Sequence, residues 1–299
     1  MQVYHNRYRR LLITVSRLLE NGEAERVVIM PELPEVETIV RGLRRPLENR
    51  RVVSARLRPV GLYRKNSLRV NWLAGRTITR VERVGKNAVF RFDPPGIMTV
   101  NLGMTGQLLL FSSNDPGYAA PKKHFHGRFC LEGGVELRYY DPRRFGYFYV
   151  APSCDFARDL HIGPDPFQCD ARHLKMNLDG RTAAIKSLLL SQRIVSGLGN
   201  IYADETLFDA RVDPRTPGDS ASARAARILT SARRILERAI VHRGSTIRDY
   251  RQPDGAEGEF QQFHAVYGRK GEPCVRCGAP IKKIVLSGRG THFCPSCQS

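Results

Sequence analysis

The chain has 299 residues, of which 41% are hydrophobic, so it is long enough for two domains of ordinary size with real cores. Lys and Arg outnumber Asp and Glu by 48 to 29, and the net charge of +19 favours a polyanion such as nucleic acid over a generic basic surface. No apolar run approaches the ~18 to 20 residues that span a bilayer, so the sequence predicts a soluble protein.

The first 30 residues end in a second apparent start at Met30, where the sequence reads MPELPEVET. Residues 8–20 place several leucines on one helical face, as a transit peptide does, but three glutamates between positions 20 and 25 argue against that interpretation. A secretory signal is excluded because arginines interrupt the apolar run. We expect Met30 to be the initiator used in the cell, and residues 1–30 to be an N-terminal extension from a wrongly chosen upstream start codon.

A helix over residues 34–43 is expected directly after this second start. Pro34 suits the first helical position, and Glu35 and Glu37 fall in the first turn, where the helix dipole favours anions. An apolar stripe at helical spacing consists of Val36, Ile39, Val40 and Leu43. The pattern leaves the Pro-Glu pair after the methionine without a structural explanation.

The apolar pattern changes once along the rest of the chain. From residue 51 to about residue 150 it consists of short alternating runs such as AVFRF, QLLLF and YFYV between turns, which predicts a sandwich or a barrel. After the Pro/Gly cluster HIGPDPF the spacing becomes helical, first from Ile185 to Leu189 and then from Ile228 to Ile240. We therefore place a domain boundary near residue 163.

Two C-x-x-C knuckles lie near the C-terminus, separated by a hairpin-sized insert, and their members are Cys274, Cys277, Cys294 and Cys297. Four thiolates at this spacing predict one structural Zn²⁺ in a closed tetrahedral shell. Two disulfides or a redox pair are the less favoured alternative, because three further cysteines are unpaired and no secretion signal is recognisable. The insert predicts a β-hairpin that presents Arg289 at its turn, a shape that suits a DNA groove.

Six segments in chain order resemble the bacterial formamidopyrimidine-DNA glycosylase family. They are PELPEVET at Pro31, GKNAVF at Gly85, LGMTG at Leu102, YDPRRFG at Tyr140, GLGNIYADE at Gly197, and YGRKGEPC with RGTHFCPSC from Tyr267 onward. The resemblance implies an α+β multidomain fold with an N-terminal β-sandwich and flanking helices, a helix-two-turn-helix DNA-binding domain and a C-terminal four-cysteine zinc hairpin. After the extension, the corresponding ranges are 31–163, 164–260 and 261–299.

The same resemblance implies a function. The chain is expected to be a base-excision repair DNA glycosylase and abasic-site lyase that removes oxidised purines, 8-oxoguanine and formamidopyrimidines, from double-stranded DNA. An N-terminal proline Schiff base followed by β,δ-elimination is the expected route. One structural Zn²⁺, a monomeric state and a place at the nucleoid of the bacterial cytosol, with no membrane partner, are also expected.

The resemblance assigns the chemistry to Pro31, Glu32 and Lys86. A proline inside a chain has an amide nitrogen, whereas a terminal proline is a secondary amine, and α-amino pKa values near ~7.7 to 8 leave part of it neutral at physiological pH. The neutral amine attacks the sugar C1′ and expels the base, which leaves an iminium. Glu32 is expected to shuttle a proton to the sugar ring oxygen, and Lys86 to grip the phosphates that flank the lesion.

The resemblance also assigns contacts with DNA. Met104 is expected to enter the gap left by the extruded nucleotide, Phe145 to wedge between base pairs, and Arg143 to pair with the estranged cytosine. Plain core packing is the alternative for Met104, and a simple turn before a strand is the alternative for DPRRFG. The other expected contacts are with phosphate or with the lesion, and they come from Lys186, Asn200, Tyr202, Ser245, Thr246 and Arg289.

One position departs from the family pattern, because Asn101 stands where the family commonly has histidine. Asparagine can donate a hydrogen bond to phosphate but cannot carry charge.

Two rival functions stay open. The sister glycosylase for oxidised pyrimidines usually begins PEG and lacks the DPRRFG wedge, so purine lesions are preferred. A non-enzymatic DNA-binding module would have no use for Pro31, Glu32 and Lys86 together.

Overall fold

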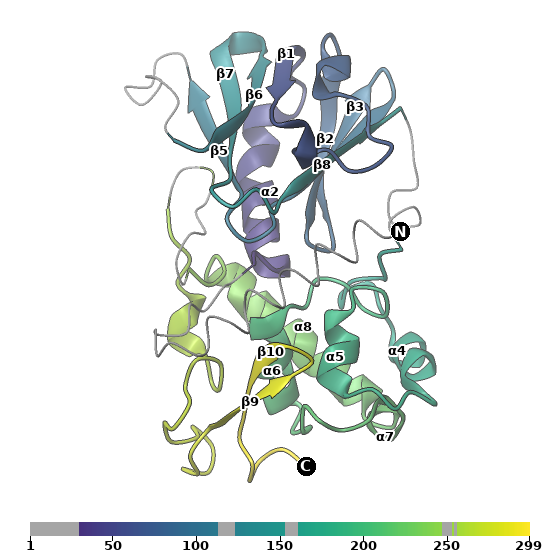
Figure 1. Ribbon diagram of the computed structural model, residues 1–299, viewed down its shortest axis with the longest axis vertical. Coiled ribbons are helices and arrows are strands. Elements are labelled where there is room, and N and C mark those ends of the chain that lie inside the picture. Colours follow the sequence, from purple (N-terminus) through teal and green to yellow (C-terminus); the bar gives the residue numbers. More distant parts are fainter. Residues whose placement is uncertain (1–29, 113–122, 153–160, 247–252, 254–255) are drawn as a thin grey trace.

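The computed structural model describes residues 30–299 except 113–122, 153–160, 247–252 and 254–255 (Figure 1). The prediction about the N-terminal extension therefore falls almost entirely outside the described residues. Two parts are visible, with most strands in the upper half of the figure and most helices in the lower half together with the C-terminal hairpin, and helix α2 extends from the first toward the second. No helix among the described residues is long and apolar enough to cross a membrane.

Helix α2 (Leu33–Leu47) confirms the helix expected after Met30 and is longer than predicted. The predicted stripe of four apolar residues is buried, and Leu47 continues it by one more turn. Because the stripe lies in the same core cluster as the strands, α2 is part of the β-domain over most of its length. Its first residue, Leu33, donates its backbone N–H to the carbonyl oxygen of Gly197 in the helical domain at 3.0 Å.

Two four-stranded antiparallel sheets form the β-domain, in the orders β1-β6-β7-β5 and β2-β3-β4-β8. Contacts between the inner faces of the two sheets show that the domain is a sandwich, which was one of the two predicted alternatives. Phe129 of one sheet stacks on Phe148 of the other with ring centroids 6.0 Å apart, and Tyr139 meets Phe148 edge-on at 4.9 Å. The strands are β1 (Val52–Leu57), β2 (Thr77–Val84), β3 (Asn87–Asp93), β4 (Gly96–Asn101), β5 (Gln107–Ser112), β6 (Phe125–Leu131), β7 (Val135–Tyr140) and β8 (Tyr147–Ala151).

The helical domain packs its helices around one apolar core. Helix α8 buries most of the predicted stripe, although Ile240 near its end is only partly buried. The boundary predicted near residue 163 lies between the last strand of the sandwich and the first of these helices, and it stays a prediction. The helices are α4 (Ala171–Leu178), α5 (Ile185–Leu190), α6 (Asn200–Asp209), α7 (Gly218–Ser222) and α8 (Ala225–Val241). The short 3₁₀ turns are η1 (Val60–Leu62), η2 (Val70–Leu73), η4 (Glu132–Gly134) and η5 (Phe260–Phe263).

The segment between α5 and α6 makes two turns and returns the chain to the β-domain. Gln192 has a φ of 60° and Gly197 a φ of 92°, so the backbone reverses twice within nine residues. A Cβ atom at Gly197 would lie 2.6 Å from Cδ1 of Leu33, and only glycine permits this approach. The expected helix, two turns and helix are therefore present, and they meet the start of α2.

The C-terminal hairpin consists of β9 (Lys282–Leu286) and β10 (Arg289–Phe293). Ser287 has a φ of 48° and Gly288 a φ of 73°, which is typical of the two-residue turns that match the twist of paired strands. Arg289 is exposed directly after this turn, as the sequence predicted. A small cluster of Phe208, Val266, Ile281 and two cysteines joins the hairpin to α6.

Candidate active site and nucleic-acid interface

Glu32 lies at the junction of the two domains and is 2% exposed. Its carboxylate accepts backbone N–H groups from the start of α6: Gly199 at 2.6 Å, Ile201 at 2.9 Å and Tyr202 at 3.3 Å. The start of a helix supplies unpaired N–H groups and a positive dipole end, so it binds an anion well. A Cβ at Gly199 would lie 2.3 Å from the Glu32 carboxyl carbon, which explains the glycine in GLGN.

The pKa of Glu32 is raised to about 7. Burial is the main cause, because it disfavours the ionised carboxylate, and the nearby carboxyl of Glu35 adds to it. The positive charge of Lys86 and the backbone N–H groups of α6 act in the opposite direction. A carboxyl group with a pKa near neutrality can both donate and accept a proton at physiological pH.

Glu35 was missed as a site residue, because the sequence pattern explained it as a first-turn charge that interacts with the helix dipole. It is 1% exposed, and its Oε1 accepts the Tyr202 hydroxyl at 2.6 Å and the Ser245 backbone N–H at 2.7 Å. Its Oε2 accepts the backbone N–H of Glu32 at 2.8 Å. Burial raises its pKa despite these hydrogen bonds. Glu35 therefore orients the backbone next to Pro31 and ties it to the helical domain.

Lys86 lies with Gly85 in the tight turn between β2 and β3 and is 9% exposed. Burial lowers the pKa of its ammonium group, while Glu32 and Glu35 counteract the shift and Arg289 reinforces it. These interactions place the Lys86 charge near both carboxyl groups and near the zinc hairpin. Gly85, the preceding residue, has a φ of 57°, and a Cβ there would lie 3.2 Å from Oγ of Ser196 in the two-turn segment.

The three residues expected to carry the chemistry thus meet at one place from three segments. Pro31 is buried beside Glu32 at the start of α2, and Lys86 approaches from the β2–β3 turn. An amine at position 31 would have a titratable carboxyl as its neighbour and an ammonium group nearby. Such a set can support attack by an amine on carbon with proton transfer to the leaving side.

Arg143 and Phe145 are exposed on the turn between β7 and β8, and Phe145 is 39% exposed. The Arg143 guanidinium carbon lies 4.8 Å from the centroid of the Phe145 ring. Asp141 stabilises this turn by hydrogen bonds. Its carboxylate accepts the backbone N–H of Gly146 at 2.9 Å, the Tyr139 hydroxyl at 2.9 Å and the Thr105 hydroxyl at 2.5 Å.

Met104 lies on a second turn that packs directly against the first. Gly103 has a φ of 59°, and a Cβ there would lie 2.5 Å from the carbonyl carbon of Phe145. The Met104 side chain is half-buried and so is not a plain core residue. Asn101 stabilises the same turn, since its Oδ1 accepts the Gly103 N–H and its Nδ2 donates to Asn87 Oδ1, both at 3.0 Å. Its amide is engaged within the protein.

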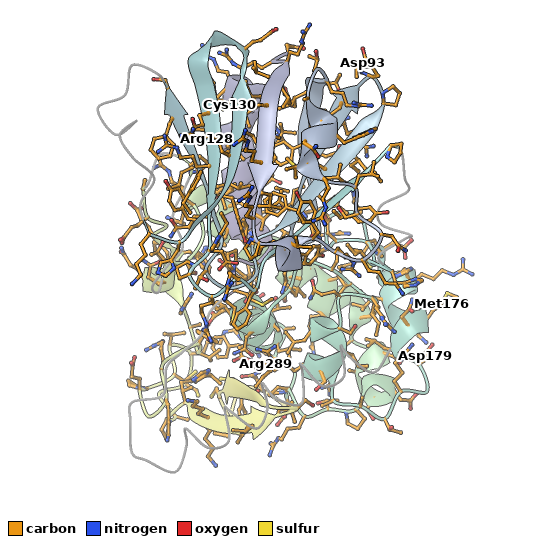
Figure 2. The ribbon with its side chains drawn as sticks, turned by 45° about the horizontal axis from the view of Figure 1, so that its top comes forward. Asp93, Arg128, Cys130, Met176, Asp179 and Arg289 are labelled. Carbon is orange, nitrogen blue, oxygen red and sulfur yellow. The ribbon has the colours of Figure 1, made fainter. Side chains whose placement is uncertain are left out.

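Asn200 and Arg289 come together where α6 meets the zinc hairpin. Asn200 Nδ2 donates to the carbonyl oxygen of Gly290 at 3.0 Å, while its buried Oδ1 has no hydrogen-bond partner among the described residues. Arg289, labelled in Figure 2, extends from the neighbouring residue of the hairpin. The structure therefore binds Asn200 to the hairpin backbone at the residue directly after Arg289.

Lys186 does not lie where the sequence placed it, on a DNA-binding surface. Its side chain is 1% exposed, and its Nζ lies 2.7 Å from Asp204 Oδ1. The same ammonium group donates to the Thr291 hydroxyl at 2.8 Å and to the Gly290 carbonyl at 3.0 Å. With two hydrogen bonds and one ion pair, the buried ammonium group of Lys186 joins α5, α6 and the zinc hairpin from inside.

Tyr202 and Ser245 also lie behind the surface, and Thr246 lies partly behind it. Tyr202 is fully buried, Ser245 is 1% exposed, and Thr246 is half-buried. The Ser245 hydroxyl lies 3.0 Å from Nε2 of His264, and the Thr246 hydroxyl accepts the Gly258 N–H at 2.7 Å. These residues support the buried carboxyl pair and the base of the loop, whereas loop residues 247–250 fall outside the described part of the chain.

The four predicted zinc ligands converge. Their sulfur atoms all lie within 4.8 Å of one another, with 3.9 Å between Cys274 and Cys297 and 3.5 Å between Cys277 and Cys294. These separations exceed a disulfide bond by more than an ångström, and they match the edges of a tetrahedron with Zn–S bonds of about 2.3 Å. The residues therefore fit one structural Zn²⁺ that would pin both ends of the hairpin.

Three family descriptions match consecutive parts of the chain: the formamidopyrimidine-DNA glycosylase N-terminal domain over residues 30–148, its H2TH domain over 162–251, and a zinc finger found in FPG and IleRS over 271–299. Formamidopyrimidine-DNA glycosylases of Laribacter hongkongensis and Thermus thermophilus are 39% and 41% identical to the chain, with 90% of the chain and 100% and 98% of the relatives covered.

Solved structures agree with this similarity. The crystal structure of the MutM (FPG) protein from Thermus thermophilus matches with a TM-score of 0.79 and 39% identity, over 90% of this chain and 98% of that one. A complex between the Lactococcus lactis Fpg and an abasic site containing DNA matches with a TM-score of 0.79 and 32% identity, over 90% and 99%.

Proposed function

The chain belongs to the formamidopyrimidine-DNA glycosylase family, and we propose that Pro31, once it is the N-terminal residue, is the nucleophile that excises oxidised purines from DNA. The protein is a base-excision repair DNA glycosylase and abasic-site lyase with a structural zinc finger. The observation that supports the role of Pro31 most directly is the buried Glu32 carboxyl beside it, with its pKa of about 7, bound to the start of α6.

The proposed reaction proceeds in two stages. The neutral amine nitrogen of Pro31 forms a bond to the sugar C1′ while the bond from C1′ to the damaged base breaks, and the proton that the nitrogen loses goes to the departing base. Glu32 then gives a proton to the sugar ring oxygen as the bond from that oxygen to C1′ breaks, which opens the ring. The product is an iminium between Pro31 and the opened sugar. Removal of protons next to the iminium then expels the 3′ and 5′ phosphates in turn, and water releases the sugar fragment from the enzyme.

The proposed DNA interface lies on the two turns and the hairpin that surround this centre. Phe145 and Arg143 are exposed beside the half-buried Met104, which suits a set of side chains that replace an extruded nucleotide. Asn200 and Arg289 suit the flanking phosphates, while Lys86 adds charge near the reacting sugar. We propose that the protein acts as a monomer in the bacterial cytosol, on DNA of the nucleoid.

Pro31 as a nucleophile is tested with two proteins that differ only before that residue. A chain that begins at Met30, whose methionine is removed in the cell, is expected to excise 8-oxoguanine, to nick the strand and to be trapped on DNA by borohydride through residue 31. A protein whose intact mass confirms all 299 residues is expected to bind the same DNA without being trapped, because its Pro31 nitrogen is an amide. Equal trapping of both proteins would remove Pro31 from the mechanism and point to a lysine.

The same assay separates the rival functions. A non-enzymatic DNA-binding module forms no reducible link to DNA, so it would not be trapped in either form. An enzyme specific for oxidised pyrimidines would be trapped on duplexes that contain oxidised pyrimidines and would leave 8-oxoguanine in place. Trapping on 8-oxoguanine opposite cytosine is the expected result, because the DPRRFG turn that carries Arg143 and Phe145 is intact and exposed.

A further inference from the structure

Arg83, near the end of β2, has a side chain that is only 8% exposed and donates in three directions. Its Nε donates to Glu37 Oε2 at 3.0 Å and its Nη2 to Asp165 Oδ2 at 2.8 Å. Its Nη1 donates to the carbonyl oxygen of Gly85 at 3.1 Å. One guanidinium group therefore joins α2, the segment that connects the two domains, and the turn that contains Lys86.

Each of the three residues that accept a hydrogen bond from Arg83 is connected to an active-site residue. Glu37 lies in the second turn of α2 and not in the first as the sequence predicted, because the helix that Pro31 and Glu32 precede begins at Leu33. Gly85 is the neighbour of Lys86, so its carbonyl position fixes where the lysine side chain begins. The third partner, Asp165, is 5% exposed and accepts the Phe167 N–H through its other oxygen at 2.9 Å.

The connecting segment is itself tied to the two turns between α5 and α6. Gly163 donates its N–H to the Gln192 carbonyl, and Ser196 donates its N–H to the Pro164 carbonyl, both at 2.9 Å. These two turns end at Gly199, where α6 binds the Glu32 carboxylate. Arg83 thus links Lys86 to the elements that hold Glu32 from both domains.

We propose that Arg83 is a positioning residue that acts through Lys86 and holds its ammonium group in place relative to Glu32. The planar guanidinium presents donors in several fixed directions, which a lysine ammonium on a flexible stem cannot reproduce. The carboxylates of Glu37 and Asp165, whose side chains are 12% and 6% exposed, compensate the charge of the guanidinium group. The inference rests on the proposed role of Lys86 in the reaction.

The test compares Arg83→Gln with Arg91→Gln in the chain that begins at Met30. Arg91 lies in the adjacent strand β3, is 50% exposed and pairs with Glu82 at 2.6 Å, so its replacement removes the same charge from the same sheet without touching the site. The readouts are the single-turnover rate of 8-oxoguanine excision at saturating enzyme and the Kd for DNA with a tetrahydrofuran site. Arg83→Gln should lower the rate about tenfold or more with little change in Kd, since small misplacements of reacting groups are costly. Arg91→Gln should change neither quantity.

A double-variant cycle decides whether Arg83 acts through Lys86. In a Lys86→Ala background, Arg83→Gln should add almost no further loss of rate. An equal loss in both backgrounds would overturn the inference while leaving the role of Lys86 intact. A wild-type rate for Lys86→Ala alone would instead refute the proposed role of that lysine. Arg83→Lys, which keeps the buried charge, replaces Arg83→Gln in the cycle if the latter does not fold, and the same outcomes apply.

Discussion

Because Lys186 is buried, we predict that Lys186→Met lowers the free energy of unfolding of the protein and leaves its affinity for DNA largely unchanged. The ammonium group lies 2.7 Å from Asp204 Oδ1, with the two side chains 1% and 0% exposed. Breaking a buried pair by removal of one partner costs about 3 to 5 kcal/mol, because the remaining charge is left without compensation. We expect a loss near the lower end, about 3 kcal/mol, since Asp204 Oδ2 keeps the backbone N–H of His292 at 2.8 Å and methionine fills a similar volume.

The measurement is urea unfolding followed by circular dichroism at 222 nm, which reports the helices. Tryptophan fluorescence would report the other domain, because the single tryptophan of the chain, Trp72, lies in the β-domain. Lys282→Met, at an exposed position of the hairpin, is the matched control for charge. The double variant Lys186→Met with Asp204→Asn should recover most of the stability, because no lone buried charge remains. A stability loss below about 1 kcal/mol, together with a drop of about 0.9 in the salt slope of DNA binding, would refute the structural role.

Three further predictions concern the site. Excision should be fastest between about pH 7 and pH 8. The pKa of Glu32 is about 7, so its carboxyl group loses the proton that it must give as the pH rises above 7, whereas a terminal amine with a pKa near ~7.7 to 8 becomes protonated and unreactive as the pH falls below its own pKa. A rate that is flat from pH 5.5 to 9 would contradict this assignment. Cys294→Ser should release Zn²⁺ and weaken DNA binding while the β-domain stays folded, and metal analysis that finds no zinc in the unchanged protein would exclude the site. Phe145→Ala should slow 8-oxoguanine excision far more than cleavage at a preformed abasic site, which has no base to unstack; equal losses on both substrates would indicate general damage to DNA binding.

Local patterns in the sequence predicted those features that depend on neighbouring residues. The stripe of α2 follows from helical spacing, and the zinc ligands follow from two C-x-x-C knuckles, because the geometry of each lies within a few residues. The sequence shows glycines at 197 and 199 but not their neighbours, and the structure identifies Leu33 and Glu32 as the groups that approach them.

Tertiary structure alone decided which charges are buried. Sequence reasoning treated Lys186 as a phosphate ligand, whereas it pairs with Asp204 and binds hairpin residues about a hundred positions away. Glu35 was explained as a charge in the first turn of a helix that interacts with the helix dipole, and it is enclosed by Tyr202 and Ser245 from the other domain. The residue type of a charged side chain does not show whether the side chain lies in solvent or in a buried ion pair. Only the packing of distant segments removes its hydrating water and supplies its partner.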